Sequence, residues 1–495
     1  MIFDPYGELV WSGANISGQT LSYNIFTYNG SQVIGVWTGQ FEGSGYGMGY
    51  DLVLDTAYNT VATINSTLGS PTDFHELSIT PDGTALVTVY DKVPYNLSSY
   101  GVVTDDPAGG AILQGQFEEI DIATGKGIFN WSSLDHVDPS MSYADPGTTG
   151  TDMSNAWDYF HINSIDKDGD GNYLVSSRHC HAIYKIDKTD GHIIWTLNGK
   201  NSSFALGNNT AFSWQHDARW RTDYTQMSIF DNAATAFESD AASSRGLLLN
   251  IDQSNMTASF ALETYPYNYT TSDSQGSMIL QPNGNWLMGW GQQPYVSEYD
   301  PSGNMLWSFQ FGLGTTQSYR AFRSNWTAYP TTSPNISVES NSSSNAYDVY
   351  VSWNGATEVQ MYHLYHSSST DGKGLNWLQT ANKTGFETWL SVPMSSAAQS
   401  DYFQIVAANS ANKTLGYTDF MSTDGTTRSP ATSSESSSVV SQSPSQTSSV
   451  SPSSSSSSTK TGAASKRSFL SAWTRSGLTF GVLVVGMIMG SAAVL

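Results

Sequence analysis

The sequence predicts an all-β protein that begins with a six-bladed β-propeller. The chain has 495 residues, of which only 13% are charged, whereas Gly (44 residues), Tyr (27) and Trp (15) are abundant. Glycine-rich turns between aromatic strands are typical of proteins with many short strands. A turn phrase that begins with aspartate recurs six times, and strands of alternating apolar and polar residues lie just upstream of several copies.

The recurring phrase is an aspartate, a turn and then an apolar or tryptophan-bearing strand. Its six copies begin at Asp4, Asp55, Asp121, Asp187, Asp252 and Asp300. Each unit has room for four strands but cannot bury its own apolar face, so it must pack against its neighbours. Four-stranded units repeated radially form a β-propeller, which also protects strand edges. Six copies predict six blades over residues 1–330. An irregular β-sandwich with similar hairpins is the alternative, because the second and fifth copies are degenerate.

Two segments of different character follow the predicted propeller. Residues 331–424 open with a polar linker and continue with alternating strands, the early ones carrying a tryptophan. This pattern predicts a small β-sandwich of fibronectin III or immunoglobulin type, in which we assign no function to His363 and His366. Residues 425–465 are rich in Ser, Thr and Pro and nearly devoid of apolar side chains, so we expect a disordered stalk.

The final segment, residues 466–495, predicts attachment to a membrane. An apolar run from Leu478 to Leu495 ends the chain, and small residues at 462–465 precede it by one short spacer. This layout is that of a GPI-attachment signal, and a C-terminal transmembrane helix is the alternative. The residues at the N-terminus lack the pattern of a signal peptide, so we expect the natural protein to carry a further segment before residue 1. The alternative is a cytosolic protein, in which the glycosylation motifs and the apolar C-terminal run would be accidental.

Composition and sequence motifs indicate the secretory pathway and the cell surface. The net charge of −23 excludes nucleic acid as a partner, because phosphate binding needs clustered Lys and Arg. The single cysteine, Cys180, cannot form an intrachain disulfide. Fourteen N-x-S/T sequons, spread along the chain and ending before the stalk, predict a glycosylated protein. The predicted acceptors are Asn15, Asn29, Asn65, Asn96, Asn130, Asn201, Asn208, Asn255, Asn268, Asn325, Asn335, Asn341, Asn382 and Asn412.

The stretch from residue 155 to residue 232 concentrates the side chains that can carry chemistry. Five of the nine histidines lie here, namely His161, His179, His181, His192 and His216. The motifs DYFHINS, SSR and WQHDARW occur in this stretch, and DFHEL occurs upstream of it. Their combined order closely resembles the arylsulfotransferase family, especially its fungal branch. The resemblance covers most of residues 1–330.

This resemblance implies a six-bladed propeller that moves a sulfuryl group from a phenolic sulfate ester to a phenol. It implies neither a nucleotide sulfate donor such as PAPS nor a metal or other cofactor. Independently of the family, two-step sulfuryl transfer needs a nucleophile that is strong when neutral and leaves readily, which imidazole provides. It also needs cationic donors on the sulfuryl oxygens and an acid or base at the phenolic oxygen.

Matching motif by motif, the resemblance places the sulfated histidine at His216 in WQHDARW. His161 and Asn163 in FHINS, with Arg178 in SSR, resemble the family's oxyanion and leaving-group set, and His75 in DFHEL resembles its other essential histidine. Residues 161 and 163 of one strand share a face, so both are expected to point into a central channel.

Three aromatic residues near these motifs, Trp157, Phe160 and Trp214, are expected to form walls for a phenol. The expected partners are therefore a small phenolic sulfate donor and a phenol acceptor. We also expect activity to rise as the pH falls toward the histidine range, because protonated histidines would attract the anionic donor in this acidic chain.

Two patterns that suggest metal sites are better explained by structure. Asp166, Asp168 and Asp170 copy half of a calcium-binding loop, but Ser177 stands where the loop needs Glu, so a hairpin turn is predicted. In a strand, His179 and His181 would face away from Cys180, so these three cannot converge on zinc.

Two other functions stay open. A propeller that lost catalysis and binds cell-wall glycans or mediates adhesion would also suit a sandwich, a stalk and an anchor. A quinone-cofactor dehydrogenase is suggested by the D-x-x-T-G-K turn from Asp121 to Lys126, but six repeats and one cysteine count against it.

Overall fold

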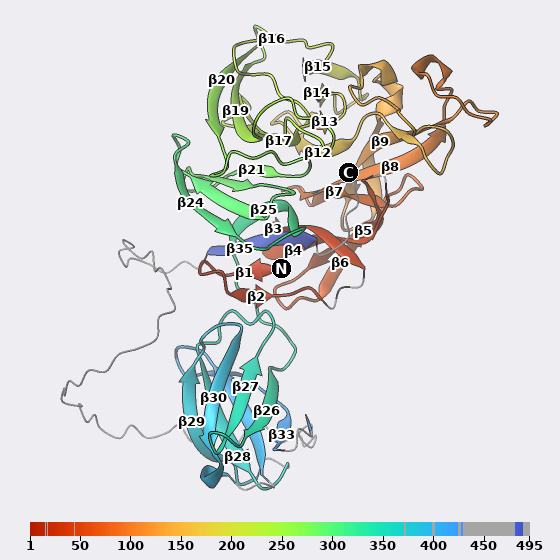
Figure 1. Cartoon of the computed structure of the whole chain (residues 1–495). Helices are drawn as coiled ribbons and strands as arrows, with labels where there is room; N and C mark the ends of the chain where they lie inside the picture. The colour runs from red at the N-terminus through yellow and green to blue at the C-terminus, as the bar shows by residue number, and fades with distance from the viewer. Residues whose placement is uncertain are drawn as a thin grey trace. The chain divides into compact units, whose positions relative to one another are not determined.

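The computed structural model describes residues 1–14, 16, 18–43, 45–370, 373–397, 401–423, 427–428 and 481–488. They form two compact units (Figure 1). Unit 1 contains Met1–Thr332, Asn354–Glu358 and the strand at 481–488, and unit 2 contains the other described residues. The predicted stalk lies outside the described residues except for 427–428, and Asn15 also lies outside them.

The prediction of an all-β protein is confirmed, because every described regular element is a strand apart from four short 3-10 helices. These helices are η1 (Ser98–Tyr100), η2 (Ser133–Asp135), η3 (Pro139–Met141) and η4 (Met394–Ser396). In the part of the chain that the structure describes, no helix is both long and apolar enough to cross a membrane.

The largest sheet of unit 1 has nine strands. Its order is β10-β9-β8-β7-β5-β4-β3, with β11 paired to β9 and β6 paired to β5. Their bounds are β3 (Gln19–Tyr28), β4 (Ser31–Phe41), β5 (Gly47–Leu54), β6 (Thr60–Ile64), β7 (Thr72–Ile79), β8 (Thr84–Pro94), β9 (Ala111–Asp121), β10 (Lys126–Ser132) and β11 (Trp157–Asp158). This sheet joins two groups of strands that the repeats predict as separate blades, so the number of blades stays a prediction.

Three smaller sheets follow along the chain. The first contains β12 (Ile162–Lys167), β13 (Tyr173–Ser177), β14 (Ala182–Ile186) and β15 (Ile193–Asn198). The second contains β16 (Ala205–Leu206), β17 (His216–Arg221), β18 (Gln226–Asp231), β19 (Arg245–Asp252) and β20 (Thr257–Thr264). The third contains β21 (Ser277–Leu280), β22 (Trp286–Gly289), β23 (Tyr295–Tyr299) and β24 (Met305–Gln310).

The last sheet of unit 1 combines strands from three parts of the chain. Its order is β2-β1-β35-β25, with bounds β1 (Ile2–Phe3), β2 (Leu9–Trp11), β25 (Gln317–Asn325) and β35 (Gly481–Ile488). Strand β35 belongs to the segment predicted as a membrane anchor, and in the structure its backbone pairs with β1 and β25. Membrane attachment therefore stays a prediction.

Six strands form a closed ring at the centre of unit 1. Strand β3 neighbours β7, and the ring continues through β12, β17, β21 and β25, which neighbours β3 again. Buried apolar side chains fill the spaces between successive sheets and form separate clusters there. The ring is the propeller-like arrangement that stacked repeat units predict, and it brings the first strand of each repeat to a common axis.

All six predicted aspartate turns are present, each joining two neighbouring antiparallel strands. Asp4 lies between β1 and β2, Asp55 between β5 and β6, Asp187 between β14 and β15, and Asp300 between β23 and β24. Asp121 is the last residue of β9, before β10, and Asp252 is the last residue of β19, before β20. In every copy the carboxylate accepts a backbone N–H from a residue two or three positions later. The same local hydrogen bond makes aspartate favourable in turns.

Unit 2 consists of two antiparallel sheets. One contains β26 (Asn335–Asn341), β27 (Ala346–Ser352) and β30 (Glu387–Pro393). The other contains β28 (Met361–Ser367), β29 (Asn376–Asn382), β31 (Tyr402–Ala408), β32 (Thr414–Tyr417), β33 (Phe420–Ser422) and β34 (Thr427–Arg428). The assignment of this unit to the fibronectin III or immunoglobulin type stays a prediction.

Candidate active site

The three histidines carried over from the motifs meet at one end of the ring. His75 lies on β7, His161 immediately precedes β12, and His216 begins β17. The ring centroids of His75 and His161 are 4.8 Å apart, and those of His161 and His216 are 6.5 Å apart. All three side chains are almost completely buried. We call these three residues, together with His179, the histidine cluster.

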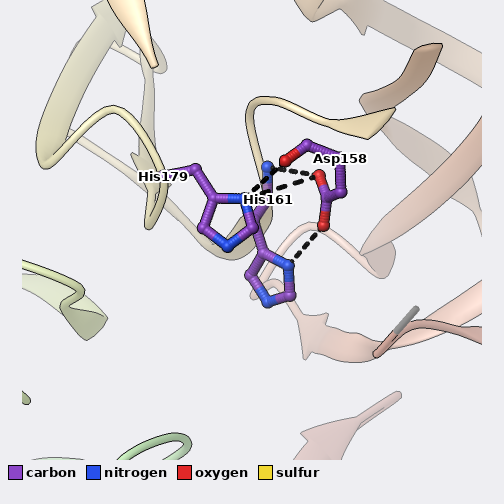
Figure 2. A group of neighbouring side chains, drawn as sticks. All are labelled: Asp158, His161 and His179. Carbon is purple, nitrogen blue, oxygen red and sulfur yellow. Dashed lines mark hydrogen bonds and ion pairs between the residues drawn. The ribbon is translucent and has the colours of Figure 1, made fainter. Parts of the chain in front are cut away.

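Each of the three histidines has a partner for its Nδ1 atom. Asp73 Oδ1 lies 2.6 Å from Nδ1 of His75. Asp158 Oδ2 lies 2.6 Å from Nδ1 of His161, as Figure 2 shows. Sequence reasoning missed both aspartates, although each lies only two or three residues before its histidine, and such a spacing is a usable signal.

His216 has an amide partner instead of a carboxylate. Its Nδ1 lies 2.8 Å from Oδ1 of Asn232, whose Nδ2 donates to the carbonyls of Ser272 and Gln275. These two bonds fix the orientation of the amide, so Nδ1 of His216 must donate the hydrogen. The backbone N–H of Gln275 points at Nε2 from 3.3 Å, which requires a lone pair on that atom. His216 is therefore a neutral imidazole whose lone pair lies on Nε2, where it accepts the long bond from the Gln275 N–H.

Burial favours the uncharged form of three histidines of the cluster, His161, His179 and His216. Desolvation, followed by the nearby charge of Arg178 and of neighbouring histidines, lowers the pKa of His216 well below its usual value. Desolvation, His75 and Arg178 have the same effect on the pKa of His161. Burial also raises the pKa of Asp158, although His179 opposes this shift. Neutral imidazoles can act as nucleophiles and as proton acceptors.

His179, which the sequence analysis assigned to a strand, is a member of the cluster. The chain turns between β13 and β14, and His181 has a left-handed φ of 48°. The expectation that His179 and His181 share a strand face is therefore wrong. The ring of His179 lies 4.7 Å from that of His161, and its Nδ1 lies 2.6 Å from the carbonyl oxygen of Asp158 (Figure 2).

The other two residues of this tripeptide lie elsewhere. His181 stacks on Tyr143 with ring centroids 4.1 Å apart, and Cys180 is buried in a hydrophobic cluster. Ligand atoms of Asp158, His161 and His179 lie within 4.8 Å of one another. The short contacts of both histidine Nδ1 atoms to oxygens of Asp158 are those of hydrogen bonds.

Arg178 brings a cation to the cluster without a carboxylate partner among the described residues. One terminal nitrogen donates to the carbonyl of Asp273 (2.8 Å), and the other contacts Nε2 of His179 (3.0 Å). Its guanidinium lies over the ring of Trp214 at 5.3 Å, while its buried Nε has no hydrogen-bond partner. Burial lowers the pKa of Arg178 to about 10, so it remains charged at neutral pH.

Only one of the three expected aromatic walls lies at the cluster. Trp214 packs edge-on against His179 and His181. Trp157 and Phe160 lie in the hydrophobic core on the other side of the same chain segment, where Phe160 contacts Trp131 and Tyr184. The expectation for these two residues is wrong, because His161 has a left-handed φ of 53° and breaks the alternation of a regular strand. Two tyrosines replace them.

The tyrosines are Tyr90 and Tyr319, whose rings lie 5.5 Å from that of His75. Their hydroxyls donate to backbone carbonyls of Ile162 and Asn163. Burial is the main cause that raises the pKa of both phenols. Both phenols are therefore protonated at neutral pH, and their hydroxyls already have hydrogen-bond partners. No spacing in the sequence indicated them.

Asn163 ties neighbouring strands together. Its Nδ2 donates to the carbonyl of Gln215, and its own carbonyl accepts a bond of 2.7 Å from Arg320. The side-chain oxygen is buried and has no hydrogen-bond partner. The residue therefore borders the cluster, but its amide nitrogen is already occupied.

The backbone around the site is irregular in a repeated way. The pairing register shifts inside β7, β12 and β17, beside His75, Asn163 and Asp217 respectively. Trp214 and Asp217 have left-handed φ values of 55° and 54°. Such bulges and strained residues occur next to active sites because they redirect side chains out of the regular alternation. Here they direct the cluster toward the axis.

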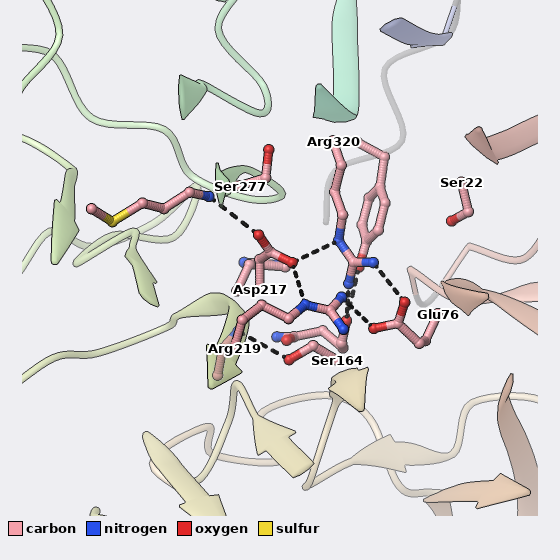
Figure 3. Close-up of polar contacts among 12 residues, drawn as sticks. Ser22, Glu76, Ser164, Asp217, Arg219, Ser277 and Arg320 are labelled. Atoms are coloured by element: carbon pink, nitrogen blue, oxygen red, sulfur yellow. Dashed lines mark hydrogen bonds and ion pairs between the residues drawn. The ribbon is translucent and has the colours of Figure 1, made fainter. Parts of the chain in front are cut away.

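Next to the histidine cluster lies a group of four charged side chains, three of them buried and Arg219 half-buried, shown in Figure 3. We call it the ion network: Glu76, Asp217, Arg219 and Arg320. Glu76 contacts Arg219 at 2.6 Å and Arg320 at 2.9 Å. Asp217 contacts the same two arginines at 2.9 and 3.4 Å. Burial alone would raise the pKa of Glu76, but the two arginines outweigh it and lower that pKa. The sequence analysis did not predict this network.

Comparisons with known proteins bear on the family. The model of the family described as arylsulfotransferase (ASST) matches residues 25–312. No curated protein matches the chain.

Many solved structures match at low similarity. The β-propeller domain of Myceliophteria thermophila Cps50 (Swd1) is 9% identical with a TM-score of 0.36, over 62% of this chain and 90% of that one. A catalytically inactive virginiamycin B lyase from Staphylococcus aureus with quinupristin is 12% identical with a TM-score of 0.33, over 80% and 94%. Hydrazine synthase from Kuenenia stuttgartiensis is 8% identical with a TM-score of 0.26, over 70% of this chain and 65% of that one.

Proposed function

The chain belongs to the arylsulfotransferase (ASST) family, and from this membership we propose that it moves a sulfuryl group from a phenolic sulfate ester to a phenol through a sulfohistidine at His216. The observation that carries the proposal is the state of that ring. Asn232 holds the hydrogen on Nδ1, and Nε2 keeps a lone pair beside a buried cation, Arg178.

In the first step of the proposed reaction, Nε2 of His216 attacks the sulfur and forms an N–S bond. The S–O bond to the donor breaks, and its electron pair stays on the phenolic oxygen. Arg178 offsets the negative charge on the sulfuryl and leaving oxygens, for which it has an unused buried N–H and no carboxylate within ion-pair range in the described structure.

In the second step, the acceptor phenol attacks the sulfur and the N–S bond returns its electron pair to His216. The acceptor must lose its proton, and His161 is the proposed base. Its Nδ1 faces Asp158, which leaves Nε2 to accept the proton. The released donor phenolate takes up a proton in turn, so no external reductant, oxidant or nucleotide is needed. His75, edge-on to His161, is the second proposed base.

The burial of the cluster changes our expectation for the pH dependence. The pKa values of His161 and His216 are lowered well below 6.5, so both rings are neutral at neutral pH and stay neutral as the pH falls through 6.5. Protonated histidines are therefore not available to attract the donor in that range. We now expect a flat activity profile between pH 5 and 8 instead of a rise toward acid.

Around this site we propose a six-bladed propeller, a fibronectin III-type sandwich and attachment to the cell surface by the C-terminal segment. The closed ring of six strands supports the propeller. Of the thirteen predicted glycosylation sites among the described residues, twelve are exposed and Asn341 is half-buried, which supports exposure to the secretory pathway. A loss of mass on treatment with an N-glycosidase would test the glycosylation.

The test of the function uses the full-length protein with p-nitrophenyl sulfate, with and without phenol. We expect phenol-dependent release of nitrophenol, reduced at least about 1000-fold in His216→Ala. His192→Ala removes an exposed histidine of the same segment and is the matched control, with activity unchanged. Mass spectrometry after brief exposure to the donor should find the sulfuryl adduct on the peptide that contains residue 216.

Two other outcomes are informative. Release that survives in His216→Ala would keep the activity but move the nucleophile to His161 or His75. No release from well-folded protein with any phenolic donor would reject sulfuryl transfer and favour the binding propeller.

A further inference from the structure

A cavity lies among the six ring strands, further along β7 and β17 than the histidine cluster. It has a volume of about 550 Å³ and is lined by residues from all six ring strands, β3, β7, β12, β17, β21 and β25. On β7 and β17 the lining residues follow the cluster histidines by one to five positions. The ion network lines its inner side through Glu76, Arg219 and Arg320.

Cationic side chains gather around this cavity in an otherwise acidic chain. The protein has a net charge of −23 and only 20 Lys and Arg residues. Five of the 20 line the cavity: Lys167, Arg219, Arg221, Arg320 and Arg323. Four of them already have carboxylate partners, since Lys167 pairs with Glu119, Arg323 with Glu298, and the other two belong to the ion network.

Arg221 is the cation of this group that lacks a carboxylate within ion-pair range among the described residues. Its terminal nitrogens donate to the carbonyls of Trp220 (3.2 Å) and Met278 (3.1 Å). Its Nε is buried and has no hydrogen-bond partner. Desolvation lowers its pKa, although Asp217 and Asp166 oppose the shift. A guanidinium whose buried N–H has no partner costs free energy unless an anion compensates it.

The carboxylates that line the cavity do not pair directly with Arg221 among the described residues. Glu76 is used by Arg219 and Arg320. The two oxygens of Asp166 accept the backbone N–H groups of Lys167 and Trp220, each at 2.9 Å. Their hydrogen bonds direct both acids toward partners of the protein, so Asp166 acts on Arg221 from beyond ion-pair distance.

We propose that this cavity binds a small tetrahedral oxyanion of the sulfate and phosphate class through Arg221. A guanidinium presents parallel N–H donors whose geometry matches two oxygens of such an ion. Lys167 and Arg323, whose side chains are partly exposed, add positive potential at the cavity. The ion network separates this oxyanion cavity from the histidine cluster, so the proposal does not depend on the proposed sulfuryl transfer.

The test is calorimetric titration of the full-length protein with sodium sulfate and, separately, sodium phosphate, at constant ionic strength. Because Arg178 can also attract an anion, we expect two binding events in the wild type. Arg178→Met should retain the event at the oxyanion cavity. Arg221→Met should weaken binding at the oxyanion cavity at least tenfold. Arg221→Lys should also weaken it, because an ammonium group replaces the forked N–H donors of the guanidinium.

Lys126→Gln removes an exposed cation outside the cavity and is the charge-matched control, with unchanged titrations. Should Arg221→Met fail to fold, Arg323→Met, which alters the partly exposed edge of the same cavity, is expected to weaken the event. The proposal would be overturned if every folded cavity variant bound sulfate and phosphate with the same affinity as the wild type. The readout is binding, so a failed turnover assay has no bearing on it.

Discussion

The histidine cluster and the ion network are neighbours in the ring, but they differ in whether their charged groups have partners of opposite charge. His75 directly precedes Glu76, and His216 directly precedes Asp217. In the ion network every charge meets two opposite charges within 3.4 Å. In the cluster, Arg178 meets no carboxylate within ion-pair range among the described residues and keeps an unsatisfied Nε.

This difference separates what stabilises the ring from what the ring positions for chemistry. Buried charges that compensate one another hold strands together, and removing one partner leaves the other uncompensated. Buried polar groups that lack compensation cost stability, and they persist where a ligand supplies the missing charge. The comparison therefore predicts that substitutions in the ion network lower the stability of unit 1, whereas removal of the unpaired cation in the cluster lowers activity without lowering stability.

The largest effect should come from breaking the ion network. Glu76→Gln leaves Arg219 and Arg320 with one carboxylate between them, so we expect the free energy of unfolding of unit 1 to fall by about 3–5 kcal/mol. Calorimetric unfolding would measure it. Asp190→Asn, which removes an exposed carboxylate paired with His192, should leave the transition unchanged. An equally small change for Glu76→Gln would show that the network does not hold the ring.

Arg178 should behave in the opposite way. Arg178→Met removes a buried cation that has no carboxylate partner, so we expect unfolding at the same or a higher temperature. The rate of nitrophenol release should fall about 100- to 1000-fold, because the developing oxyanion loses its cationic donor. Arg178→Lys should recover part of the rate. A loss of stability without a loss of rate would make Arg178 a structural residue.

The all-β fold could be predicted because its signals are local. Each aspartate turn is fixed by a hydrogen bond that spans two or three residues, so all six could be found from the sequence. The fusion of two groups of strands into one nine-stranded sheet depends on pairing between distant segments, such as β5 with β7. No residue pattern within either strand announces that pairing.

The site was predictable only where a motif named the residue. His75, His161, Arg178 and His216 do come together, as their motifs implied. His179 was missed because strand alternation was assumed through a segment that turns, as the φ of 48° at His181 records. Asn232 lies sixteen residues from its histidine, and only the pairing of β17 with β18 brings them close.

The corrected aromatic wall gives a smaller and more selective test. Trp214→Leu should raise KM for the phenolic substrates about tenfold, because its ring lies against Arg178 and His179. Trp157→Phe should lower the stability of unit 1 by about 1–3 kcal/mol and leave KM unchanged, because Trp157 belongs to the core. Steady-state kinetics and calorimetry distinguish the two. The reverse pattern would restore Trp157 as a substrate wall.

The smallest expected effect is a pH dependence of stability that arises from the cluster itself. Burial lowers the pKa of His179 from 6.5 to about 3. Below pH 6.5 the unfolded chain binds a proton at this residue and the folded chain does not, so stability falls as the pH decreases toward 3. The loss is at most about 1.4 kcal/mol per pH unit for one histidine. Asp158 acts in the opposite direction because burial raises its pKa, so the comparison must be between matched proteins.

The unfolding temperature of unit 1 should fall less steeply between pH 6.5 and 5 in His179→Gln than in the wild type. His192→Gln, at an exposed histidine whose pKa is raised by Asp190, should not flatten the slope. Parallel slopes for the wild type and His179→Gln would show that His179 is protonated in the folded protein, and the neutral cluster on which the proposed mechanism rests would then need revision.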